Sequence, residues 1–213
     1  MGRSYRAIIS DQPTLTMNLR NISDLFLYEL WTLNDAKQQV ITLLLRMSRL
    51  ASSYELLEEL AGHADKAKGH IYLIRTIISS YQAIPPVKRC AAMEGLIASS
   101  ELLFNNCGAA NATALDAALI CASLDIVHYE VAKLERLRFY ANLLSDRQTV
   151  TILNAVLNDS VETQHHLTEL MSLCVNLDSV SPPKSIPVPG VRPAPPAVSR
   201  IRPAIDPPRS HER

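Results

Sequence analysis

The chain has 213 residues, of which 21 are Lys or Arg and 21 are Asp or Glu, so its formal net charge at pH 7 is zero. This balance gives no support to a nucleic-acid or membrane partner, and no apolar stretch approaches the roughly 18 residues that a membrane span requires. The four cysteines are scattered without a C-x-x-C pair, which is typical of free thiols in a reducing compartment, so we expect a soluble, cytoplasmic protein.

The proline content separates a C-terminal segment from the rest of the chain. Ten of the 13 prolines lie at or beyond Pro182, and residues 181–213 carry six Lys or Arg against two Asp or Glu. Such a segment cannot bury a core, so we predict a disordered, basic, Pro-rich tail over 179–213. Its stretch "RPAPPAVSR" contains a P-x-x-P pattern, which leaves open docking to a protein partner. Residues 1–21 are predicted to be an N-terminal extension.

Between these segments the sequence is typical of helix almost throughout. The predicted helices cover residues 22–51, 52–81, 88–104, 113–144 and 145–177. Ser52, Thr113 and Ser145 are the expected caps of the second, fourth and fifth helices, because each is followed three residues later by an acidic or amide side chain. The break between the second and third helices is "AIPPVK", where two prolines end the helical pattern.

The lengths and links of these segments predict how they pack. Two helices of nearly thirty residues are joined by a very short link, a shorter helix follows, and a second such pair ends the pattern. Short links make neighbouring helices antiparallel, and each helix needs a partner for its apolar stripe. We therefore predict an all-α fold, a four-helix bundle over residues 22–178 with the short helix as its crossover.

The first predicted helix has an apolar stripe with a lysine at its centre. The residues that recur at steps of three or four on this face are Phe26, Leu30, Leu33, Val40, Leu44 and Met47. Lys37 occupies the position that completes the series. Lys66 lies beside the stripe of the second helix, and Ser160 lies on that of the fifth. Polar groups at matching depth are typical of a cofactor site in a bundle, but a protonated lysine cannot ligate a cation.

Several stretches resemble the YciE/YciF-type ferritin-like stress proteins. They are "LFLYEL…DAKQQV", "CAAMEGLI", "DAALICASLDIVHYEVA" and "LNDSVETQHHLTEL". They follow the family's order over about residues 22–175, and "AMEGLI" and "HYE" are the most specific. The resemblance implies a ferritin-like bundle, a homodimer, a carboxylate-rich interior suggestive of a di-metal centre, and an association with bacterial stress responses.

The resemblance fails where the metal ligands would lie. The family commonly has glutamate at five positions at which this chain has Lys37, Lys66, Ser99, Val127 and Ser160. The residues that do match the family pattern are Glu94, His128, Tyr129 and Glu130. Two lysines in place of acids would put positive charge where two dications should bind. We therefore interpret the five positions, together with Glu130, as a core polar cluster at a former metal site, with no metal and no catalytic residue.

Within this cluster we expect the ammonium group of Lys37 to replace the metal as the counter-charge of Glu130. Lys66 is a second candidate for the same role. The alternative for both lysines is that the side chain extends along its stem to the surface. The position of Lys66 at the edge of its stripe favours that alternative.

Three functions remain open at this point. The first is a non-catalytic, degenerate ferritin-like bundle without a cofactor, acting as a dimeric structural, stress-associated or partner-binding protein. The second is a metal-dependent oxidase or ferroxidase with a rearranged iron or manganese site, for which His70, His128 and Glu130 are the candidate ligands. In the third, the tail recruits a protein partner and the bundle is a dimeric anchor.

Overall fold

The computed structural model describes residues 19–82, 89–107 and 112–177, and these residues form five α-helices and no strand. The helices are α1 (Ile22–Leu50), α2 (Tyr54–Ser80), α3 (Ala91–Asn105), α4 (Ala112–Leu143) and α5 (Arg147–Leu177). The helices predicted from the sequence are confirmed to within three residues at each end. Most of the predicted N-terminal extension and all of the predicted Pro-rich tail lie outside the described residues.

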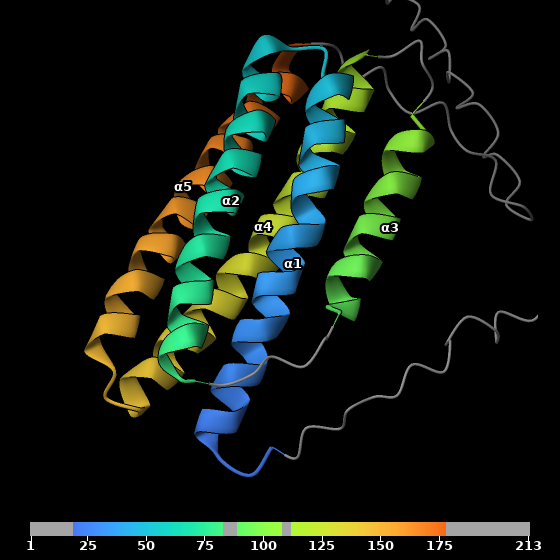
Figure 1. Cartoon of the computed structure of the whole chain (residues 1–213). Helices are drawn as coiled ribbons and strands as arrows, with labels where there is room; N and C mark the ends of the chain where they lie inside the picture. The colour runs from blue at the N-terminus through green and yellow to red at the C-terminus, as the bar shows by residue number, and fades with distance from the viewer. Residues whose placement is uncertain (1–18, 83–88, 108–111, 178–213) are drawn as a thin grey trace, which may run out of the picture. The chain divides into compact units, whose positions relative to one another are not determined.

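The four long helices form two antiparallel hairpins, α1 with α2 and α4 with α5 (Figure 1). The hairpins pack side by side, because α1 also contacts α4 and α2 also contacts α5. The short helix α3 lies against α1 and α4 on the outside of this four-helix arrangement. The fold is therefore an all-α, ferritin-like four-helix bundle with a short crossover helix, as the sequence predicts.

Side chains at the starts of α2 and α5 show why the chain turns where it does. The Oγ atom of Ser53 accepts a hydrogen bond from the backbone N–H of Leu56 over 3.2 Å, so Ser53 caps α2 and the predicted cap, Ser52, is one residue too early. Asp146 caps α5, because its Oδ1 atom accepts from the backbone N–H of Thr149 over 3.0 Å. The predicted cap, Ser145, instead adopts a φ of 57° in the turn.

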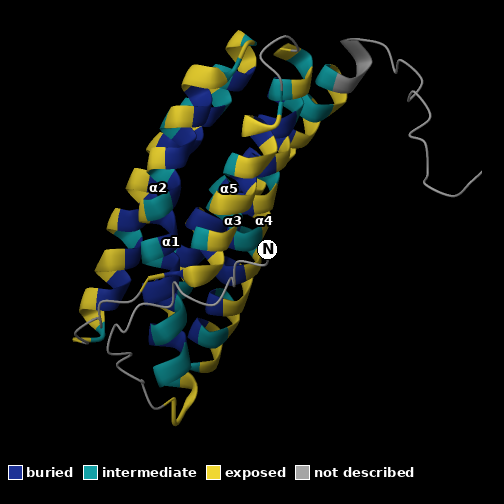
Figure 2. Ribbon diagram, turned by 90° about the vertical axis from the view of Figure 1, so that its right-hand side faces the viewer, coloured by how far each residue is buried: buried dark blue, intermediate teal, exposed yellow. Residues whose placement is uncertain are grey.

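The core consists of two apolar clusters, one toward each end of the bundle. The first contains Val40, Leu44, Met47, Leu56, Leu60, Met93, Phe104, Leu119, Ile126 and Leu167. The second contains Phe26, Leu30, Trp31, Ile74, Ile77, Leu134, Leu137, Leu153 and Val156. Buried polar residues lie between the clusters along the four long helices: Lys37, His70, Glu130, Ser160 and Thr163. We call these five residues the polar layer. Figure 2 shows the buried positions turned toward the bundle interior.

Helix α4, through its apolar composition, corrects the expectation that no segment is long and apolar enough to span a membrane. It contains an 18-residue window with a mean hydropathy of 1.3, which meets the length and composition of a membrane span, contrary to the expectation from the sequence. In the fold, 44% of this window is buried. The helix α4 contacts α1, α3 and α5, and its buried apolar residues pack in the core of the bundle.

Candidate functional site

A buried ion pair joins α1 to α4 at the centre of the bundle. The Nζ atom of Lys37 donates a hydrogen bond to Oε2 of Glu130 over 2.7 Å, and the two side chains are 1% and 0% exposed. Lys37 lies on the inward stripe of α1 between Leu33 and Val40, and Glu130 lies one turn before Leu134 on the inward face of α4. Removing a charge from water costs several kcal/mol, so each of these groups depends on the other.

Glu130 is ionised at neutral pH although it is fully buried. Burial by itself favours the protonated carboxyl, but the charge of Lys37 and the nearby His63 lower the pKa of Glu130 from 4.5 to about 2. The Nε2 atom of His63 lies 3.5 Å from Oε2 of Glu130, and the His63 side chain is 3% exposed. Groups from α1 and α2 therefore face the same carboxylate oxygen. The other oxygen, Oε1, makes no hydrogen bond to the described part of the chain.

His70 forms the other side of the polar layer, between α2 and α5. Its Nε2 atom lies 3.0 Å from Oδ2 of Asp159. Burial and the charge of Lys37 lower the pKa of His70 from 6.5 to about 4, although the hydrogen bond with Asp159 acts in the opposite direction. His70 is therefore neutral at pH 7, and Lys37 is the charged amine that influences both halves of the layer.

The structure buries four of the six residues predicted for the core polar cluster: Lys37, Val127, Glu130 and Ser160. The other two, Lys66 and Ser99, do not lie in the interior, and for Lys66 this is the surface alternative that its position at the edge of the stripe favours. The Nζ atom of Lys66 donates to Oε2 of Glu162 over 2.8 Å near the surface, where 33% of the lysine side chain is exposed. Ser99 is exposed on α3 because its neighbour Ser100 takes the buried position.

The alternative metal site is not assembled either. His128 is exposed on α4 whereas Glu130 is buried, because residues two apart on a helix point about 200° apart. His70 instead faces Asp159. Across the described ranges, no group of three or more His, Cys, Asp or Glu side chains is arranged to hold a metal ion.

A second buried lysine was missed from the sequence. The Nζ atom of Lys133 donates to Oε2 of Glu29 over 2.5 Å and to Oγ1 of Thr32 over 3.0 Å. Its side chain is 8% exposed and that of Glu29 is 15% exposed. Its burial could have been inferred from spacing. Lys133 is three residues after Glu130 and therefore lies near it on the same side of α4. Two lysine–glutamate pairs thus connect α1 to α4.

Asp116 also has a role that the sequence did not predict. Its carboxylate accepts hydrogen bonds from the backbone N–H and hydroxyl of Ser52, over 2.8 and 2.6 Å, and from the backbone N–H of Ser53 over 3.0 Å. Asp116 is 3% exposed. The predicted pairing of Asp116 with Thr113 is thus replaced by a contact that fastens the α1–α2 turn to α4.

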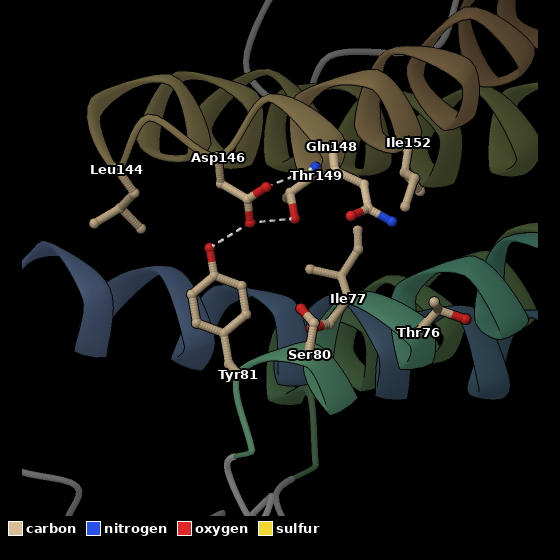
Figure 3. A pocket seen from close by; sticks show the side chains of 9 residues that line it. All are labelled: Thr76, Ile77, Ser80, Tyr81, Leu144, Asp146, Gln148, Thr149 and Ile152. Carbon is tan, nitrogen blue, oxygen red and sulfur yellow. Dashed lines mark hydrogen bonds between the residues drawn. The ribbon is translucent and has the colours of Figure 1, made fainter.

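A cavity of about 450 Å³ lies where the end of α2 meets the α4–α5 turn. Figure 3 shows Tyr81 and Asp146 facing each other there: the Tyr81 hydroxyl donates to Oδ2 of Asp146 over 2.9 Å, and the Thr149 hydroxyl donates to the same atom over 2.7 Å. Burial raises the pKa of Tyr81 to about 12, so its hydroxyl remains a neutral donor. Asp146 also caps α5 here. We therefore interpret Tyr81, Asp146 and Thr149 as a structural contact that connects the end of α2 to the start of α5.

The residues at the bundle centre do not fit a di-metal centre. Such a centre needs several carboxylates with imidazoles, all facing inward. Here the interior presents the amine of Lys37, the alkyl group of Val127 and the hydroxyl of Ser160, and Glu130 is already bound to Lys37. The donor set is therefore suited to an internal ion pair.

The fold and its centre define a class of protein, a ferritin-like helical bundle whose interior is neutralised by a lysine–glutamate pair. The chain belongs to the family described as a domain of unknown function, DUF892, whose sequence model matches residues 21–179. Together with the similarity to YciF given next, this match confirms the resemblance identified in the sequence.

The chain is similar in sequence and in structure to one particular protein of known structure. It is 30% identical over 162 residues to Protein YciF of Escherichia coli strain K12, over 75% of this chain and 96% of that protein. It is similar to the crystal structure of the E. coli stress protein YciF, with a TM-score of 0.70 and 28% identity over 75% of this chain and 99% of that one. YcfI from Rhodopseudomonas palustris shares the fold, with a TM-score of 0.68 and 24% identity over 72% of this chain and 96% of that one.

Proposed function

We propose that this chain is a non-catalytic, stress-associated member of its family that acts as a homodimeric helical scaffold without a di-metal centre. The observation that carries the proposal is the Lys37–Glu130 pair. An ammonium group occupies the bundle interior and binds a carboxylate that matches the family pattern. The stress association is supported by the similarity to the E. coli stress protein YciF, and the homodimer by what the family resemblance implies.

Electrostatics supports the absence of a di-metal centre. Two unit charges 4 Å apart interact by about 4 kcal/mol at an effective dielectric constant of 20, and a dication doubles this to about 8 kcal/mol. A metal ion beside Glu130 would therefore be repelled by the buried ammonium of Lys37. Deprotonating Lys37 to relieve the repulsion would remove the counter-charge that lowers the pKa of Glu130.

A scaffold role also agrees with the rest of the core. Apolar clusters fill both ends of the bundle, and two ion pairs, Lys37 with Glu130 and Lys133 with Glu29, join α1 to α4. These contacts hold the helices together, and each carboxylate of the two pairs has an ammonium group bound to it. We infer that the bundle and its ion pairs serve to pack the helices.

Elemental analysis of the purified full-length protein tests the proposal, before and after incubation with ferrous iron or manganese under anaerobic conditions and removal of unbound metal. We expect well below one metal ion per chain in each case. One or two ions per chain, lost on replacing Glu130 by Gln, would overturn the proposal and favour the oxidase alternative. Replacing the exposed His128 by Gln is the control, since it should not change the metal content.

A further inference from the structure

Buried polar atoms without partners gather at the centre of the bundle. In the described ranges, seven buried side-chain nitrogen or oxygen atoms have no hydrogen-bond partner in the protein, and five of them belong to only four residues: His63, His70, Glu130 and Ser160. These four residues are between 0% and 3% exposed. Polar atoms in a protein interior are nearly always hydrogen-bonded, either to the chain or to ordered water. The five atoms therefore indicate a further hydrogen-bonding partner.

The four residues lie at one level of the bundle, although three helices carry them. On α2, His63 faces Glu130 of α4, and 3.5 Å separates Nε2 of His63 from Oε2 of Glu130. His70, two turns further along α2, faces Asp159 of α5, and Ser160 is the next residue of that helix. The polar layer and the neighbouring His63 therefore hold all five unpartnered atoms.

The chemistry of these atoms defines what the partner must supply. The Oε1 atom of the ionised Glu130 can only accept a hydrogen bond. His70 is neutral, and its Nε2 atom donates to Asp159 because a carboxylate is only an acceptor, which leaves Nδ1 of His70 as an acceptor too. The hydroxyl of Ser160 and the imidazole of His63 can each donate and accept. The partner must therefore donate at two places and also accept.

Charge and size restrict the partner further. The ammonium of Lys37 and the carboxylate of Glu130 already balance each other, so an added ion of either sign would bring an uncompensated charge into the interior. Protein interiors contain few spaces larger than a water molecule. The side chains beside the unpartnered atoms include the short ones of Ser160 and of Ala67, which shares the inward face of α2 with both histidines. A neutral molecule of the size of water meets all of these conditions.

We propose that the polar layer is a buried water-binding site, in which one water molecule donates a hydrogen bond to Oε1 of Glu130 and a second donates to Nδ1 of His70. His63 shares the first water because it faces Glu130, and Ser160 shares the second because it adjoins the residue that His70 binds. An internal water typically makes about three hydrogen bonds, and globular proteins hold roughly one buried water for every 27 residues. The inference rests on the proposed function, which keeps metal ions out of the same interior.

Both waters connect the α1–α2 hairpin to the α4–α5 hairpin. The first lies between His63 of α2 and Glu130 of α4, and the second lies between His70 of α2 and Ser160 of α5. They act together with the Lys37–Glu130 pair, which connects the same hairpins through α1 and α4. Removing a side chain that binds one of the waters should therefore lower the stability of the whole bundle.

A crystal structure of the full chain, at a resolution that shows ordered solvent, tests the site directly. We expect solvent peaks about 2.7–3.2 Å from Oε1 of Glu130 and from Nδ1 of His70. If neither atom has a peak within hydrogen-bond distance, the inference fails and the proposed function stands. A peak with the anomalous scattering of a transition metal overturns both.

Ser160→Ala tests the site in solution, and Ser123→Ala is the matched control. Both serines are buried on long helices, but the hydroxyl of Ser123 already donates to the backbone carbonyl of Leu119 over 2.9 Å. Removing the Ser160 hydroxyl takes a partner from the bound water. We therefore expect the equilibrium constant for unfolding in urea to be about fivefold higher for Ser160→Ala than for Ser123→Ala.

A core without water gives the opposite result for the same pair of variants. Ser160→Ala would then remove an unsatisfied buried polar atom, which stabilises the fold. A Ser160→Ala chain that is at least as stable as Ser123→Ala therefore overturns the water between His70 and Ser160.

Discussion

Lys37 and Glu130 are 93 residues apart in the sequence, and their charged atoms are 2.7 Å apart in the core. The pair connects one helical hairpin of the bundle to the other, because Lys37 belongs to α1 and Glu130 to α4. Neither side chain reaches the bulk solvent, and in the described part of the chain each charged group faces the other, with Nε2 of His63 lying 3.5 Å from the same carboxylate oxygen. Changes at these two residues therefore give the sharpest tests of the core.

Replacing Lys37 with methionine removes the charge and keeps an unbranched side chain that is one heavy atom shorter. Glu130 is then a buried carboxylate without its main counter-charge, and breaking a buried pair in this way typically costs about 3–5 kcal/mol. We expect the free energy of unfolding in urea at pH 7 to fall by that amount.

The double variant Lys37→Met with Glu130→Leu is the matched control for this experiment. It removes both charges, so most of the lost stability should return, and it could exceed that of the natural protein because a well-packed apolar pair replaces a buried ion pair. A single variant as stable as the natural protein would show that Lys37 is not the counter-charge of Glu130.

Replacing Lys37 with glutamate reverses the charge at the same position. Two carboxylates and His63 would then face one another in the core, which is a donor set that zinc or manganese can use. We expect this variant to be destabilised without metal and its melting temperature to rise by several degrees with Zn²⁺, whereas the natural protein should show no such rise. The same substitution at Lys133, beside Glu29, provides the control for a general effect of added acid.

Stability should decrease as the solution is made acidic. His70 has a pKa of about 4 in the folded chain and 6.5 when unfolded, so below pH 6.5 the unfolded chain takes up a proton that the folded chain does not. Glu130 has a pKa of about 2 in the folded chain and 4.5 when unfolded, so its stabilising effect is present above pH 4.5 and is lost as the pH falls toward 2.

Each of these two changes in pKa corresponds to about 3.4 kcal/mol at most. Urea unfolding at pH 7, 5.5 and 4 measures the first effect. His70→Asn should remove the loss between pH 6.5 and 4 and leave the loss at lower pH. An unfolding free energy that is constant between pH 7 and 4 in the natural protein would contradict the assignment of a neutral, buried His70.

Asp116→Asn should destabilise the bundle through the α1–α2 turn. The carboxylate accepts three hydrogen bonds from Ser52 and Ser53, and an amide supplies one good acceptor oxygen in place of two. We expect a loss of about 2–3 kcal/mol, typical of hydrogen bonds to a charged group. Asp125→Asn, at an exposed aspartate of the same helix, should change stability by less than about 0.5 kcal/mol in the same thermal or urea measurement.

The sequence predicts the helices of this protein well because their signals are local. Apolar residues at helical spacing, two prolines and short polar links give the bounds of five helices to within three residues. Lys37 could be placed in the core for the same reason, since it completes a stripe whose other members are all apolar. The spacing of residues within one helix cannot predict a contact between two helices. The contact of Lys37 with Glu130 is instead predicted from the family pattern.

The remaining site residues could not be placed because their positions depend on tertiary packing. On α4 the apolar Val131 is a better candidate for a buried position than Lys133. The structure nevertheless buries Lys133, because Glu29 on α1 provides a partner for its charge. On α3 both faces are apolar or small, so periodicity could not decide between Ser99 and Ser100. The direction of the Lys66 side chain is determined by its ion pair with Glu162 on α5, which is 96 residues away in the sequence.

The polar layer also restricts how the two hairpins can slide past each other. One helical turn corresponds to a shift of 5.4 Å along the axis, which would bring the ammonium of Lys37 opposite Ile126 or Leu134. Both of these side chains are completely buried hydrocarbon. Apolar contacts alone specify an alignment less strongly, because the hydrophobic effect is not directional. A single ion pair at mid-length therefore favours one alignment of the two hairpins. Every other alignment would leave a buried charge without its partner, which is unfavourable in free energy.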